Sequence, residues 1–159
     1  LDDRPNQLDR TREDAEVTAT DLLAVHRLTA GLPTEQGLRA NVAVTLRYLT
    51  AWLGGAGAVA VFGLLEDVAT AEIARCQLWQ WQHHCTRLAG GSLATADLVR
   101  RHIDRERSAL LAEGAEGADP KLVDNAVRIL EETALGNELP AFLTTEAYTR
   151  HLVRVRTAA

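Results

Sequence analysis

The sequence predicts a mainly α-helical fold of about five helices, without a (β/α)₈ barrel. Apolar residues recur at helical spacing in several segments, and residues that start or stop helices stand between those segments. The chain has 159 residues, far short of the roughly 250 that a (β/α)₈ barrel needs. Apolar residues make up 47% of the sequence and charged residues 25%, which is typical of a globular domain and excludes a disordered or collagen-like chain.

The first core helix is predicted to begin at Glu35. The apolar residues that follow are spaced by three or four positions and share one helix face, namely Leu38, Val42, Leu46, Leu49 and Leu53. Gly54 and Gly55 follow at once and stop the helix.

A short extended segment is predicted next. Residues 58–62 (AVAVF) are too few for a typical helix and precede Gly63, so we expect a buried strand that leads into Glu66 and Asp67. The second helix follows, capped by Asp67 or Thr70 and ending no later than Gly90 and Gly91. Its predicted inward face contains Thr70, Ile73, Ala74, Gln77, Leu78 and Trp81.

The remaining helices are predicted from their starting residues. Thr95 is a suitable N-cap for a third helix, and residues 114–120 form a loop. Asp119 followed by Pro120 starts a fourth helix that ends near Gly136 and Asn137, and a short fifth helix follows Thr144 or Thr145. The inward residues are Leu98, His102, Ile103 and Leu110 in the third helix and Leu122, Ala126, Ile129 and Leu130 in the fourth.

The N-terminal residues 1–21 differ in composition from the rest. They are polar, with scattered charges of both signs, which predicts a linker or arm before a helical domain over residues 22–159. They contain no apolar h-region, so we expect no signal peptide and a cytoplasmic protein.

Charge and hydropathy argue against nucleic acid and membranes as partners. The 17 Lys and Arg and 22 Asp and Glu residues leave a formal net charge of −5, and no basic block is present. Residues 48–65 are uncharged over about the length that spans a bilayer. This run contains four glycines, and its first third completes the first core helix, so we expect no membrane span.

Residues of metal-ligating types occur in the middle of the chain, namely Cys76, His83, His84, Cys85 and His102. They have neither CxxC nor HxxxH spacing, so we expect no metal site on this chain and reduced, buried thiols. Trp79 and Trp81 are two positions apart and cannot share a helix face. We expect one of them in the core, and the other either packs there too or faces a partner or substrate.

The segment GLLEDVATAEI at residues 63–73 is the most unusual, because two carboxylates stand between apolar stretches. Such flanks predict burial of Glu66 and Asp67, and a carboxylate in a water-poor site can act as a base on a carbon acid. Capping is the alternative role of Asp67, and contact with a helix N-terminus stabilises the anion. Asp67 is therefore the candidate catalytic residue, with Glu66 as its supporting neighbour.

Further motifs occur before and after this segment. In chain order they are RPNQL at residues 4–8, GLRAN at 37–41, Tyr48, AWL at 51–53, LWQWQHH at 78–84, EL at 138–139 and FLT at 142–144. Together they resemble the C-terminal plug domain of malate synthase, of the A type. The resemblance covers nearly the whole chain.

The resemblance implies an enzyme that condenses acetyl-CoA with glyoxylate to give malate, using Mg²⁺ and two domains. In that family a TIM barrel binds the metal and glyoxylate. The helical C-terminal domain closes over the barrel mouth and supplies an Asp that removes a proton from the acetyl methyl group; Asp67 matches this position. The resemblance places Mg²⁺ on the barrel, so we expect this chain alone to be inactive, and the sequence assigns no residue that contacts CoA.

Two alternatives accompany this hypothesis. A helical domain that has lost its barrel would act as an interaction or regulatory module. A split malate-synthase-like enzyme, with its barrel in a separate chain, would keep the Claisen chemistry but act on a different acyl-CoA or keto acid. A neighbouring coding sequence for a barrel with acidic metal ligands would favour a split enzyme, and its absence would favour the module.

Overall fold

The computed structural model describes residues 3, 5–9, 11, 13–24, 31–113 and 118–153. The chain divides into two compact units, Leu1–Gly31 and Leu32–Ala159. The boundary expected between residues 21 and 22 stays a prediction. Arg4 of the RPNQL motif and residues 114–117 of the expected loop lie outside the described residues.

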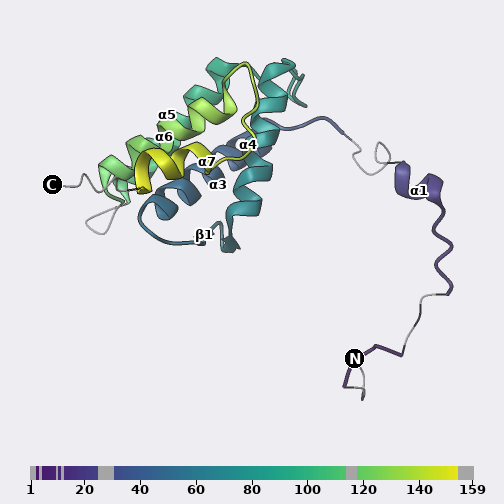
Figure 1. Ribbon diagram of the computed structural model, residues 1–159. Helices are drawn as coiled ribbons and strands as arrows, with labels where there is room; N and C mark the ends of the chain where they lie inside the picture. Colours follow the sequence, from purple (N-terminus) through teal and green to yellow (C-terminus); the bar gives the residue numbers. More distant parts are fainter. Residues whose placement is uncertain are drawn as a thin grey trace. The chain divides into compact units, whose positions relative to one another are not determined.

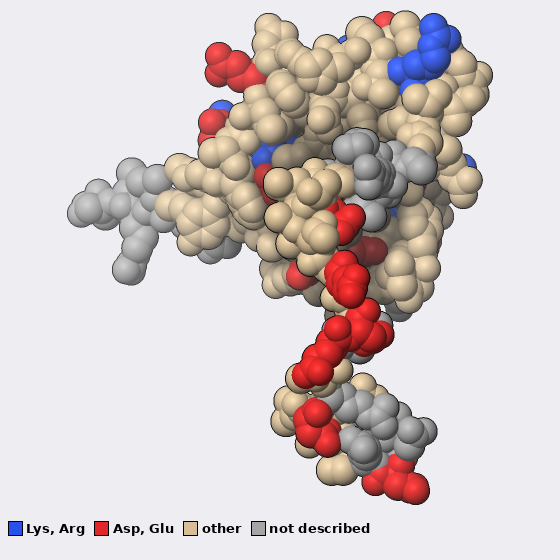
Figure 2. Space-filling model, turned by 90° about the vertical axis from the view of Figure 1, so that its right-hand side faces the viewer, with Lys and Arg blue, Asp and Glu red and all other residues tan. Residues whose placement is uncertain are grey.

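Among the described residues of the first unit is the short helix α1 (Ala19–Leu23), which the sequence analysis did not predict. A capping box starts it: the Asp21 backbone N–H donates to Thr18 Oγ1 at 3.2 Å, and the Thr18 N–H donates to Asp21 Oδ2 at 3.0 Å. The hydroxyl and N–H of Thr18 lower the pKa of Asp21. Figure 2 shows acidic side chains along the first unit. All charged side chains among its described residues are Asp or Glu.

The second unit is mainly α-helical, as predicted, and its described residues contain no barrel (Figure 1). Its long helices are α3 (Glu35–Leu53), α4 (Val68–His83), α5 (Ala96–Ala112) and α6 (Pro120–Ala134). The short α7 (Thr145–Ala147) continues into a π-helical turn, η1 (Tyr148–Leu152). The predicted starts at Glu35, Thr95, Asp119 and Thr144 are confirmed.

Helix α3 is central to the core, because it packs against α4, α5 and α6. The five residues predicted on its inward face are all buried. The predicted inward faces of α5 and α6 are also confirmed, except that Leu122 is only half-buried. The prediction for α4 is wrong at Ile73, which is 60% exposed, because the buried face of α4 runs through Ala71, Ala74 and Leu78.

Helices α3 and α4 end in the same hydrogen-bonded motif. At the end of α3, Gly55 has φ +94°, and the Ala56 N–H donates to the Ala51 carbonyl at 2.9 Å. At the end of α4, Cys85 takes the left-handed position with φ +45°, and the Thr86 N–H donates to the Trp81 carbonyl at 2.8 Å. Helix α4 therefore ends at His83, well before the glycines that were predicted as its limit.

Between these helices lies an antiparallel hairpin of β1 (Val59–Val61) and β2 (Leu64–Glu66), with Val59 opposite Glu66. The predicted strand is confirmed, but β2 was not predicted. The expected burial of residues 58–62 is wrong, because alternate side chains of a strand point to opposite faces. Val61 is buried, whereas Ala60 and Phe62 are exposed.

The uncharged run over residues 48–65 is divided between α3, a turn and this hairpin. Among the described residues, no helix is long and apolar enough to cross a membrane.

Candidate active site at the base of the hairpin

Asp67 lies where β2 ends and α4 begins. Its backbone is extended, and its Oδ1 accepts hydrogen bonds from the N–H groups of Ala69 at 2.9 Å and Thr70 at 3.3 Å. These are two of the N–H groups that have no partner inside the helix, so Asp67 is the N-cap of α4. Of the two caps that the sequence allowed, Asp67 is confirmed.

The two carboxylates are not enclosed as the sequence predicted. Asp67 is exposed and Glu66 is half-buried. The large apolar residues around them are exposed as well, with Leu64 at 65%, Leu65 at 78% and Ile73 at 60% exposure. The prediction of burial is therefore wrong for this chain by itself, since the apolar flanks that suggested it face solvent.

The hairpin is fixed to the helical core from below. Val61 packs with Val44 of α3 and Ala74 of α4, and the half-buried Val59 joins them. A hydrogen bond of 2.8 Å from Asn41 Nδ2 to Gln77 Oε1 joins α3 to α4. The position of Asp67 is therefore set by both helices.

Tyr48 of α3 is almost fully buried, and it lies close enough to Asp67 to be affected by its charge. Burial, and to a smaller extent the negative charge of Asp67, raise the pKa of the Tyr48 hydroxyl. The side chain is therefore neutral at physiological pH. The sequence gave Tyr48 no role in the site, because the two residues come from different helices and only the fold brings them together.

A buried ion pair on α4 ties this helix to the C-terminal segment. Glu72 accepts hydrogen bonds from the Arg75 guanidinium and, at 2.9 Å, from the backbone N–H of Leu143. Arg75 is completely buried and also donates to the Pro140 carbonyl at 3.0 Å. Burial raises the pKa of the neighbouring Cys76 thiol, and the Glu72 carboxylate also contributes to this.

Comparisons with known proteins identify the family. The profile "Malate synthase, C-terminal" matches residues 32–151. The chain belongs to the malate synthase family. It is 41% identical over 150 residues to malate synthase A of Escherichia coli, and 45% identical over 151 residues to a malate synthase of Streptomyces clavuligerus. These alignments cover 93% and 94% of this chain but 28% of each relative, so the chain spans little more than a quarter of their length.

The metal-ligating residue types of this malate synthase C-terminal domain do not gather. In the part of the chain that the structure describes, no group of three or more His, Cys, Asp or Glu side chains could hold a metal ion. His102 is buried against Glu35, with 3.1 Å between Nε2 and Oε1, and His83 and His84 are exposed. The expectation of buried thiols is wrong for Cys85, whose left-handed position at the end of α4 exposes it.

Both tryptophans of α4 find partners inside the malate synthase domain. Trp81 packs against the main core, and Trp79 donates from its indole nitrogen to the Gly136 carbonyl at 2.9 Å. Trp79 also stacks on His83, with 4.4 Å between ring centroids. Neither indole therefore needs an external partner, and the hypothesis that one faces a partner gains no support.

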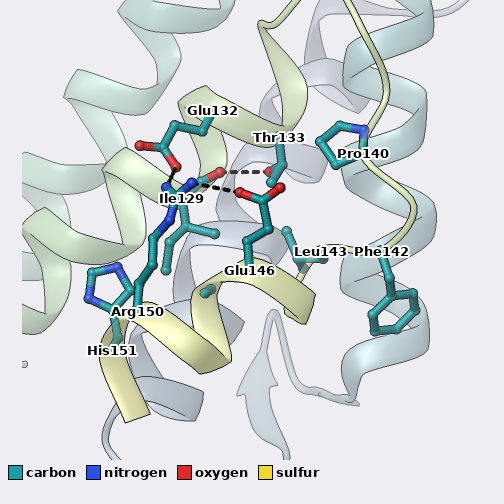
Figure 3. Close-up of a pocket in the computed structure, with 10 residues that line it drawn as sticks. Ile129, Glu132, Thr133, Pro140, Phe142, Leu143, Glu146, Arg150 and His151 are labelled. Carbon is teal, nitrogen blue, oxygen red and sulfur yellow. Dashed lines mark hydrogen bonds and ion pairs between the residues drawn. The ribbon is translucent and has the colours of Figure 1, made fainter. Parts of the chain in front are cut away.

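A cavity of about 270 Å³ lies between α6 and the C-terminal helical turns (Figure 3). Asp67 is not among the residues that line it. Arg150 points across it and pairs with Glu132 at 2.7 Å and with Glu146 at 2.6 Å. Both carboxylates are thus satisfied by one guanidinium. The arrangement ties η1 to α6, and the two carboxylates exceed the single guanidinium by one negative charge.

Proposed function

We propose that this chain supplies the general base of a malate synthase type enzyme, which condenses acetyl-CoA with glyoxylate to give malate. The observation that carries the proposal is the exposed Asp67 carboxylate, held in a fixed position at the edge of an exposed apolar surface. Membership of the malate synthase family supports it. Glu66, half-buried on β2 beside Asp67, is proposed as its supporting residue.

The two oxygens of Asp67 have different surroundings. Oδ1 accepts both helix N–H groups, whereas Oδ2 has no hydrogen-bond partner among the described residues. Oδ2 is therefore the oxygen that takes a proton from the acetyl methyl group, while Oδ1 keeps the carboxylate oriented. The resulting enolate carbon attacks the aldehyde carbon of glyoxylate, and hydrolysis of the thioester then releases malate and CoA.

Capping has a chemical cost for a base, because the helix N-terminus stabilises the carboxylate anion. Covering the apolar surface around Asp67 would remove water from the carboxylate and raise its basicity. A closed site would also hold the carboxylate beside the methyl group, and proximity of this kind lowers reaction barriers. The proposed function therefore requires a second part that covers this face.

The second part is a TIM barrel, in the same or a separate chain. The relatives are more than three times as long as the region they share with this chain, which leaves ample length for a barrel in each of them. Leu64, Leu65 and Ile73 form an apolar surface of the kind that marks a protein interface. We propose that the barrel mouth covers it.

Mg²⁺ belongs to the proposed barrel, because the described residues of this chain offer no group of ligands for it. When bound there, the metal would stabilise the negative charge of the enolate oxygen. The 159-residue chain alone is therefore expected to form no malate from acetyl-CoA and glyoxylate, and measurable malate from the purified chain would contradict the two-part arrangement.

The test compares two aspartates that cap helices in the same way. Asp119 is also exposed, and its Oδ1 accepts the Lys121 N–H at 2.8 Å at the start of α6. Since Asn caps helices about as well as Asp, Asp67→Asn and Asp119→Asn should both leave the melting temperature nearly unchanged. In the complete enzyme, Asp67→Asn should lower the rate of CoA release by about two to four orders of magnitude, and Asp119→Asn should not.

Equal turnover by the two variants would remove Asp67 from the mechanism. The same assay with other acyl-CoA thioesters and keto acids tests whether acetyl-CoA and glyoxylate are the preferred pair. A markedly higher kcat/KM for another pair would replace the substrates while leaving the base in place.

A further inference from the structure

Tyr48 of α3 combines a buried ring with an unpaired hydroxyl. The residue is only 2% exposed, and its ring belongs to the main core of the domain. Its Oη has no hydrogen-bond partner among the described residues, yet it is not one of their fully enclosed polar atoms. The hydroxyl therefore reaches the protein surface at the end of a buried ring, where another polar group or water can contact it.

The packing of α3 against α4 places Tyr48 beside the first turn of α4. A hydrogen bond joins Asn41 of α3 to Gln77 of α4. Three residues further along α3 and three residues back along α4, Val44 packs with Ala74. The two helices therefore run antiparallel in this register. One more turn in each direction leads to Tyr48 on α3 and to the capped first turn of α4.

The electrostatics agree with this placement. After burial, the negative charge of Asp67 is the influence that raises the pKa of the Tyr48 hydroxyl. Glu66 of β2 is not among the groups that act on Tyr48. The other charged side chains within one turn on the two helices have partners of their own, in the ion pairs Arg47–Glu106, Arg47–Glu113 and Glu72–Arg75.

Covering this face would leave two polar groups without water. Asp67 Oδ2 and Tyr48 Oη each lack a hydrogen-bond partner in the described part of the chain. A polar group that loses its water without gaining a hydrogen bond costs free energy, so pairing these two groups would be favourable. A neutral phenol donates one hydrogen bond and a carboxylate oxygen accepts more than one, so Oδ2 keeps a position free for the substrate proton.

We propose that Tyr48 is a positioning residue for the catalytic base: with the face covered, its hydroxyl donates a hydrogen bond to Asp67 Oδ2 and orients that oxygen toward the substrate. The carboxylate is then fixed at both oxygens, by the helix N–H groups at Oδ1 and by the hydroxyl at Oδ2. Tyr48 keeps its own proton, and the proton of the methyl group passes to Asp67. This inference rests on the proposed function, because that function makes Asp67 the base.

The first experiment measures the interaction in the 159-residue chain by an NMR titration of the Tyr48 ring carbon that bears the hydroxyl. Asp67→Asn should lower the pKa of Tyr48, because the charge that opposes ionisation of the phenol is gone. Glu66→Gln is the matched control, since it removes a negative charge one residue earlier and should leave the titration of Tyr48 unchanged. Equal titration curves for the unsubstituted chain and Asp67→Asn would overturn the proposal.

The second experiment uses Tyr48→Phe in the complete enzyme. The variant keeps the buried ring, so its melting temperature should change by less than about 2 °C. The kcat should fall by about tenfold while the KM for acetyl-CoA stays within about twofold, because the hydroxyl orients the base and does not bind the substrate. The acidic limb of the pH profile of kcat/KM should move to higher pH, since a hydrogen bond to a carboxylate favours its charged form.

Tyr148→Phe is the control for this variant. Tyr148 lies on η1 and is 56% exposed, so the loss of its hydroxyl should change neither kcat nor the pH profile. An unchanged kcat and an unchanged acidic limb in Tyr48→Phe would overturn the proposal.

A double variant separates positioning from an independent role. Since Tyr48 acts through Asp67, adding Tyr48→Phe to Asp67→Asn should lower turnover no further. A further loss of about tenfold in the double variant would give the hydroxyl a role of its own and overturn the proposal.

Failure of the two proposals can be told apart. Normal turnover by Asp67→Asn would remove the base from the mechanism and, with it, the role of Tyr48. Loss of turnover in Asp67→Asn together with normal turnover in Tyr48→Phe would keep the base and remove only the contribution of Tyr48.

Discussion

The helical core and the hairpin use the same kinds of residue in opposite ways. Leu38, Leu46 and Leu78 in the core are completely buried. Leu65 and Phe62 in the hairpin are 78% and 70% exposed. Apolar side chains in the core stabilise this domain, whereas the exposed ones of the hairpin contribute little to it and remain available for another surface.

The difference follows from the shape of the two regions. A helix in a bundle can bury a broad face against several neighbours, and α3 packs against three other helices. A two-stranded hairpin has two faces, and only the one that contains Val61 lies against helices. The other face of the hairpin is therefore left exposed in this domain.

The largest effect is expected at the buried ion pair of the core. Glu72→Ala leaves the completely buried Arg75 without its carboxylate, which should cost about 3–5 kcal/mol of unfolding free energy. Glu132→Ala is the matched control, because it breaks a pair with Arg150 in which both side chains are half exposed, and it should cost less than about 1 kcal/mol. Urea unfolding of both variants measures the difference. Similar losses would show that the α4 pair is no more critical than a surface pair.

Much of this core could be predicted from the sequence, because helix starts and stops are local signals. Thr95 and the Asp119–Pro120 pair predicted the starts of α5 and α6 correctly, and Gly54 and Gly55 predicted the end of α3. For α4 the sequence predicted only an outer limit at Gly90 and Gly91, which holds; the end itself carries no glycine signal, since Cys85 takes the left-handed position that glycine usually occupies. The hairpin turn was missed for a similar reason, because Phe62 is an unusual residue for positive φ.

Only those features of the candidate site that depend on neighbouring residues in the chain could be predicted from the sequence. Capping by Asp67 follows from a short stretch of sequence, and the structure confirms it. Its exposure was not predictable, because apolar flanks indicate burial without saying whether the partner lies within the chain. Tyr48 and Asp67 come from positions far apart in sequence, so only the packing of α3 against α4 brings them near each other.

The contrast between core and hairpin can be tested with one substitution in each. Leu46→Ala should destabilise the chain by about 2–5 kcal/mol, because it empties a completely buried position. Leu65→Ala should change the unfolding free energy by less than about 0.5 kcal/mol, since the side chain is already in water. Urea unfolding measures both. A loss above about 1 kcal/mol for Leu65→Ala would mean that the hairpin leucines also stabilise the isolated domain.

The junction between the two regions should show an intermediate effect. Asp67→Ala removes the acceptor for two helix N–H groups and should cost about 1 kcal/mol, whereas Asp67→Asn should be nearly silent in thermal melts. Equal melting temperatures for the two variants would show that the cap contributes little to stability. In that case the position of Asp67 would depend on the packing of the hairpin rather than on capping.

The smallest effect is expected at the hairpin tip, and it concerns strain rather than burial. Phe62→Gly places a residue without a Cβ in a left-handed position, which relieves about 1 kcal/mol of strain. The added freedom of glycine in the unfolded chain offsets much of this gain, so the net change should stay within about 1 kcal/mol and not be destabilising. Val61→Gly, one residue earlier but buried against α3 and α4, should lose stability clearly and serves as the control. Urea unfolding measures both variants, and a clear loss of stability in Phe62→Gly would show that the phenyl ring contributes to the fold despite its exposure.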